Sequence, residues 1–120
     1  MQPQNEQQQD RLYRLFATAL DRLDAEAREP DRWEEECLSY ALGAFACGLY
    51  PAAELELAAF ARPVRERPSD EVADLQHKPR RFTREMLRHG LDYVAGRAAL
   101  PSGMPPAGRL ALRSFLGASL

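Results

Sequence analysis

Residues 36–61, ECLSYALGAFACGLYPAAELELAAFA, are rich in small side chains and are interrupted once, by GLYP at positions 48–51. Gly48 permits a tight backbone turn, and Pro51 suits the first turn of a following helix, where its missing N–H is not needed. Before the interruption, apolar residues recur at helical spacing: Trp33, Cys37, Tyr40, Ala41, Ala44 and Phe45. The stretch therefore predicts an antiparallel helical hairpin that packs through small residues and turns at 48–51.

Helical patterns continue on both sides of this hairpin. Upstream, one apolar stripe predicts a helix over 11–28, and it consists of Leu12, Leu15, Phe16, Ala19, Leu20, Leu23 and Ala27. Asp31 followed by Glu34 matches a capping box, which places the start of the hairpin's first helix. Downstream, we expect helices near 69–75, 82–99 and 109–116. The fold class predicted is all-α, with about five to six helices.

Length and composition are those of one ordinary globular domain. The chain has 120 residues, of which 45% are hydrophobic and 28% charged, so disorder throughout is not expected. Residues 1–9, MQPQNEQQQ, predict a disordered polar tail and resemble no signal peptide. Residues 10–120 would then form a single helical domain. No apolar run reaches the roughly 18 to 20 residues that a membrane span needs, so we expect a soluble, cytoplasmic protein that does not bind membranes.

Charge is divided unevenly along the chain. Residues 1–61 contain 12 acidic and 5 basic side chains, whereas residues 62–120 contain 6 acidic and 11 basic ones. Two interpretations are open: the halves attract one another within the fold, or they face a partner or a second copy. The densest basic surface predicted lies over residues 78–97 and comprises Lys78, Arg80, Arg81, Arg84, Arg88 and Arg97.

Catalytic and cofactor motifs are absent from the sequence. Cys37, Cys47, His77 and His89 have spacings that match no zinc pattern. The cysteines are ten positions apart on one predicted helix, about 15 Å, which is too far for a disulfide. The consecutive carboxylates at 34–36 point about 100° apart and do not converge on a metal ion. We predict no catalytic residue, no metal site and no cofactor, and hence a protein that is not an enzyme.

The turn of the hairpin resembles a known repeat. Gly48, Tyr50 and Ala53 follow the G-x-Y-x-x-A form found between the two helices of a tetratricopeptide repeat, although no second copy at that family's period is visible. The resemblance covers about residues 37–61. It implies tetratricopeptide-like helix packing and a role in binding proteins, as an adaptor or small chaperone. It also implies that the first helix of the hairpin, with Tyr40 and Phe45, lines the groove for the partner.

Two functions follow from these patterns. The first is a protein–protein interaction module, possible also as a homodimer, whose partner-binding residues are predicted to be Tyr40, Phe45, Arg80, Arg81, Arg84 and Arg88. The alternative is a regulator that binds nucleic acid through the basic surface over 78–97. The pI of about 5.7 and the lack of a helix-turn-helix pattern favour the first.

Overall fold

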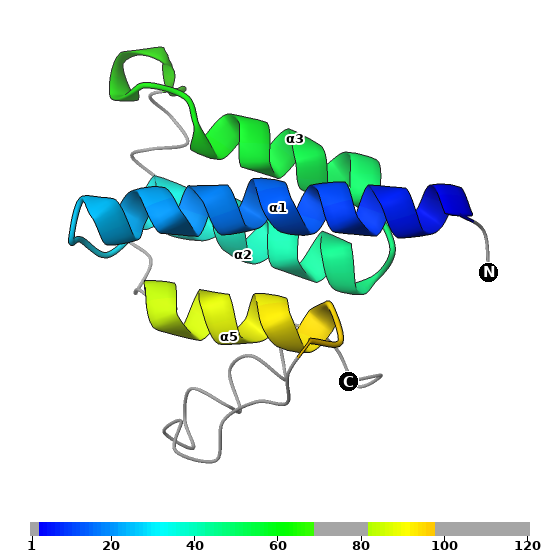
Figure 1. Cartoon of the computed structure of the whole chain (residues 1–120). Helices are drawn as coiled ribbons and strands as arrows, with labels where there is room; N and C mark the ends of the chain where they lie inside the picture. Colours follow the sequence, from blue (N-terminus) through cyan, green and yellow to red (C-terminus); the bar gives the residue numbers. More distant parts are fainter. Residues whose placement is uncertain (1–2, 69–81, 98–120) are drawn as a thin grey trace.

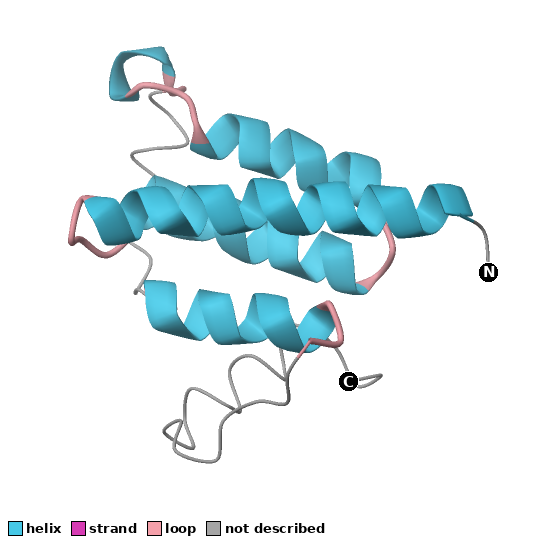
Figure 2. Ribbon diagram, viewed as in Figure 1, coloured by secondary structure: helices cyan, strands magenta, loops and turns pink. Residues whose placement is uncertain are grey.

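The computed structural model describes residues 3–68 and 82–97. Within these ranges the chain forms four α-helices, α1 (Pro3–Ala25), α2 (Arg32–Ala46), α3 (Tyr50–Phe60) and α5 (Arg84–Val94), and one 3₁₀ turn, η1 (Val64–Glu66), without any strand (Figures 1 and 2). The all-α prediction is confirmed. The number of helices differs from the five to six expected, and the helices predicted near 69–75 and 109–116 lie outside the described residues.

The four helices surround one apolar core. Around this core α1 packs on α3, α3 on α2, α2 on α5, and α5 on α1, so that α1 and α2 are diagonally opposite (Figure 1). All four helices contribute buried apolar side chains, joined by Phe82 just before α5, and the large ones include Leu12, Phe16, Leu20, Leu23, Leu38, Leu42, Leu57, Phe60, Leu87 and Leu91. Each helix therefore has two neighbours, one on either side of the core.

Helix α1 is longer than the sequence predicted. Its apolar stripe begins at Leu12, yet the helix begins at Pro3, so residues 3–9 are helical and not the disordered tail expected over 1–9. Proline is compatible with the first turn of a helix. The Gln9 side-chain amide donates a 2.7 Å hydrogen bond to the Tyr50 hydroxyl at the start of α3. The polar N-terminal turns of α1 therefore lie beside the hairpin.

The hairpin of α2 and α3 forms where the sequence placed it. The Asp31 side chain accepts a bond from the Glu34 N–H, and the Glu34 carboxylate accepts one from the Asp31 N–H, so the predicted capping box is confirmed. At the far end, the Leu49 N–H donates to the Ala44 carbonyl and the Gly48 N–H to the Phe45 carbonyl, which is a Schellman termination. The hairpin is therefore defined by local signals at both ends of α2.

Gly48 carries the backbone conformation that this termination requires. Its φ is +76°, in the left-handed region, and a Cβ added there would meet no atom within 4 Å. The cost of a substitution at this position is therefore backbone strain and not a clash.

We expect Gly48→Val to lower the free energy of unfolding by about 1–2 kcal/mol, because a β-branched residue strongly disfavours positive φ. Gly48→Asn is the matched control, and it should lose less than about 1 kcal/mol because asparagine tolerates this region. Urea denaturation of both variants measures the difference. Equal losses of unfolding free energy in the two variants would show that the turn does not need glycine for its left-handed φ.

No helix in the ranges 3–68 and 82–97 has the length and apolar character needed to cross a membrane.

Candidate functional site

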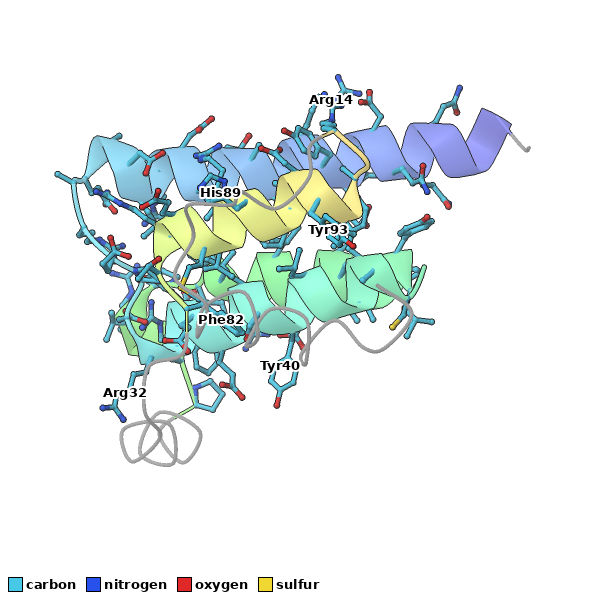
Figure 3. The ribbon with its side chains drawn as sticks, turned by 90° about the horizontal axis from the view of Figure 1, so that it is seen from below. Arg14, Arg32, Tyr40, Phe82, His89 and Tyr93 are labelled. Atoms are coloured by element: carbon cyan, nitrogen blue, oxygen red, sulfur yellow. The ribbon has the colours of Figure 1, made fainter. Side chains whose placement is uncertain are left out.

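The two aromatic residues predicted to bind a partner lie in different environments. Tyr40 is 48% exposed and points away from the bundle on the outer side of α2 (Figure 3). Phe45 is only 5% exposed, and its ring meets the Tyr50 ring edge-on with centroids 6.0 Å apart. Phe45 is therefore a core residue of the hairpin. The rings of Tyr40 and Phe45 do not form one surface.

The predicted arginines of α5 contact α1. Arg88 Nη2 donates to Asp21 Oδ1 at 2.8 Å and to Asp24 Oδ2 at 2.9 Å. Burial alone would lower the pKa of Arg88, but the hydrogen bonds to these carboxylates raise it above its usual value. Arg84 Nε lies 3.2 Å from Glu29 Oε2 and 3.5 Å from Asp24 Oδ1. Attraction between the acidic and basic halves therefore operates within the fold, at the seam between α1 and α5.

This seam bears on the nucleic-acid alternative. A phosphate group would have to displace carboxylates that already accept hydrogen bonds from Arg88 or form ion pairs with Arg84. The other two predicted arginines, Arg80 and Arg81, lie outside the described residues. The described part of the basic surface is therefore largely neutralised by α1.

The cysteines do not form a reactive pair. Both are free thiols: Cys37 is buried in α2, and Cys47 is exposed at its C-terminus. Burial, with a smaller contribution from the charge of Glu56, raises the pKa of the Cys37 thiol to about 12. Across the portion of the chain that the structure describes, no group of three or more His, Cys, Asp and Glu side chains could hold a metal ion.

An open groove lies along the seam between α1 and α3. It has a volume of about 460 Å³, is mostly apolar, and is lined by Arg11, Leu15, Thr18, Ala19, Arg22, Glu54, Leu57, Ala58, Phe60 and Ala61. The α1 members recur at intervals of three and four, as do those of α3, so each set is one stripe along its helix. Leu15 is 42% exposed here, although Leu12 and Phe16 beside it are fully buried.

Small side chains account for the open space in this groove. Alanines at positions 19, 58 and 61 line it, and the last two are exposed. Beside these alanines Leu15 is 42% exposed, whereas Leu57 and Phe60, which also line the groove, are 8% and 3% exposed. Within residues 36–61, Ala41 and Ala53 are thus buried in the bundle, whereas Ala58 and Ala61 line the groove.

Charged residues lie at the ends of the groove. Arg11 Nε is 3.6 Å from Glu54 Oε1, and Arg22 Nε is 4.0 Å from Glu26 Oε1 on the same helix. Both guanidinium side chains are more than half exposed. Sequence reasoning missed this site because Leu15 belongs to the same periodic stripe as the core residues of α1. Its exposure depends on which helix packs beside it.

A second, smaller cavity lies beside the C-terminal end of α5. It measures about 190 Å³ and is lined by Gln9, Asp10, Tyr13, Phe45, Val94, Ala95 and Arg97. The Tyr13 hydroxyl donates a 2.6 Å bond to Asp92 Oδ1, and the Arg97 guanidinium stacks 3.9 Å from the centre of the Tyr13 ring. Polar contacts within the fold thus occupy its surroundings, and the groove between α1 and α3 is the larger and more apolar site.

Comparison of the chain with protein-family models, with curated proteins and with solved structures gave no match. The tetratricopeptide-like packing stays a prediction.

Proposed function

We propose that this chain is a protein-interaction module, an adaptor or small chaperone-like domain, that holds its partner in the groove between α1 and α3. The observation that carries the proposal is the exposure of Leu15 at 42% in a mostly apolar groove. Apolar surface that is contiguous and hollowed is the usual mark of a binding face. Apolar area that a partner buries there stabilises the complex by roughly 25 cal/mol per Å².

The lining supports a protein ligand over other classes. A site for a small polar molecule needs several convergent polar groups. The one hydroxyl in this lining, that of Thr18, already donates to the Arg14 carbonyl at 2.8 Å. Nucleic acid requires a run of unopposed cations, whereas the two arginines at this groove are accompanied by Glu54 and Glu26. Apolar side chains from a partner protein fit the remaining surface.

This proposal moves the docking surface away from the residues that the sequence suggested. Tyr40 lies on α2, which is diagonally opposite α1, and Phe45 is in the core. A role as a homodimer remains compatible with the same groove, because a second copy is one form of protein partner.

The test is selection of peptides on the full chain. We expect a displayed library of amphipathic helical peptides to yield binders on the wild-type protein, and Ala58→Glu to weaken them by about tenfold or more, since it places a charge in the apolar groove. Ala58 is exposed, so this variant should fold. Ala52→Glu is the matched control: it adds the same side chain on α3 outside the groove lining and should keep the binders.

Two results would contradict the proposal. One is a library from which no binder is enriched on the folded protein. The other is a set of binders that Ala58→Glu and Ala52→Glu affect equally, which would locate binding elsewhere on the surface.

A further inference from the structure

We propose that the occupant of the groove is an amphipathic helix whose apolar stripe is bounded at both ends by acidic side chains. This inference rests on the proposed function and specifies the chemistry of the partner. It is carried by the placement of Arg11 and Arg22, which lie at the two ends of the α1 side of the groove with Leu15, Thr18 and Ala19 between them.

The backbone of the groove selects a helix over an extended segment. A strand binds by adding to unpaired backbone N–H and C=O groups. Both walls here are α-helices, in which those groups are bonded within the helix. An apolar groove between two helices instead accepts the stripe of a third, with anchors at i, i+3 or i+4, and i+7. The exposed alanines at positions 58 and 61 leave room for large apolar anchors between the walls.

The spacing of the arginines sets the register of that helix. Arg11 and Arg22 are eleven residues apart in α1, which is about 16 Å along the axis at 1.5 Å per residue. A partner helix lying along α1 would place carboxylates at two positions eleven apart opposite both guanidinium groups. Its apolar anchors would then fall in the three turns between them, over Leu15 and Leu57.

Arg11 and Arg22 can exchange their present carboxylate contacts for carboxylates of a bound helix. Their present contacts, 3.6 Å to Glu54 and 4.0 Å to Glu26, are longer than a close charge-assisted hydrogen bond. Exposed pairs of this kind contribute little to stability. A carboxylate on a partner that covers the groove can therefore replace either of these long, exposed contacts.

Charge also discriminates against two other occupants. A second copy that packs its α1 antiparallel on this groove would bring Arg11 of one chain to Arg22 of the other, which is a repulsive contact. The chain's own segment 109–116 has Arg109 and Arg113 as its only charged residues, so it lacks carboxylates for this groove. A separate acidic helix satisfies both ends.

The test uses the helical library with two edge positions, eleven residues apart, each encoded as Glu, Gln or Lys. On the wild-type chain we expect Glu at both positions to be enriched about tenfold over Lys, and on the Arg11→Glu/Arg22→Glu variant we expect Lys to replace it. Both arginines are exposed, so the double variant should fold, and its melting temperature verifies this. Arg14→Glu/Arg32→Glu is a control of equal charge change whose positions do not line the groove.

The outcomes separate this inference from the proposed function. Binders that Ala58→Glu abolishes but that show no preference for Glu, or a preference that the double variant does not reverse, overturn the acidic-helix inference alone. Absence of any binder overturns the docking role and this inference with it. A wild-type dimer in light scattering that Ala58→Glu converts to a monomer assigns the groove to a second copy and also overturns it.

Discussion

Replacing Glu34 with glutamine should lower the free energy of unfolding by about 2 kcal/mol at pH 7, because it removes the buried carboxylate of an ion pair whose arginine is 38% exposed. The Glu34 side chain is 3% exposed and accepts two hydrogen bonds from Arg28, at 2.6 Å from Nη1 and 2.9 Å from Nη2. Glutamine can still accept the bond from the Asp31 N–H, since Gln and Glu serve equally in a capping box. The variant therefore isolates the charge pairing from the helix cap.

The loss of unfolding free energy in Glu34→Gln should become smaller as the pH falls. Burial alone would raise the pKa of Glu34, but the bonds from Arg28 and from the Asp31 N–H outweigh it and hold the pKa below its ordinary value of 4.5. A carboxyl whose pKa is lowered by folding contributes stability above its unfolded pKa, and the contribution is lost as pH falls through the folded one. The difference in free energy of unfolding between wild type and Glu34→Gln should therefore be largest at pH 7 and decrease below pH 4.5.

Urea denaturation at pH 7 and at pH 3 measures both effects. The control is Glu26→Gln, which removes the other carboxylate near Arg28; it lies 3.0 Å from Nε and is 43% exposed. An exposed pair of this kind should cost less than about 1 kcal/mol. A gap that stays constant between the two pH values would mean that the charge of Glu34 is not what stabilises this corner.

Local features of the fold could be predicted from the sequence, because each depends on residues within one or two helical turns. The capping box at Asp31, the termination at Gly48 and the apolar stripe of α1 are of this kind. The helical character of residues 3–9 could not, because these residues carry no apolar stripe. A contact from Gln9 to Tyr50, 41 positions away, joins this segment to α3.

The site was harder to predict because it depends on which helices become neighbours. Arg88 bonds Asp21 across 67 positions, and nothing in the pattern of α5 indicates that α1 lies beside it. The same spacing rule placed Leu15 with the core residues of α1, whereas the partner helix decides that it faces a groove. Periodicity identifies the apolar face of a helix but not how completely its neighbours cover that face.

Arg84→Ala should lower the free energy of unfolding by about 2 kcal/mol, because several charge-assisted hydrogen bonds are lost together. Arg84 Nη1 donates to the carbonyl oxygens of Leu23, at 3.0 Å, and Arg28, at 3.3 Å, while Nε lies 3.2 Å from Glu29. The Leu23 carbonyl is in the last turn of α1, where a cation also meets the negative end of the helix dipole, and Arg28 follows in the connection to α2. The side chain thus joins the start of α5 to the end of α1.

The control is Arg14→Ala, which removes an exposed arginine 3.0 Å from Asp10 within one helix, outside the groove lining, and should cost less than about 0.5 kcal/mol. Thermal unfolding compares the two, and binding of the selected helices is measured below the transition. If Arg84 were held for a partner, its removal would weaken binding and leave the melting temperature unchanged. Its contacts require the reverse: a lower melting temperature with binding retained, because the groove lies between α1 and α3, on the other side of α1 from α5.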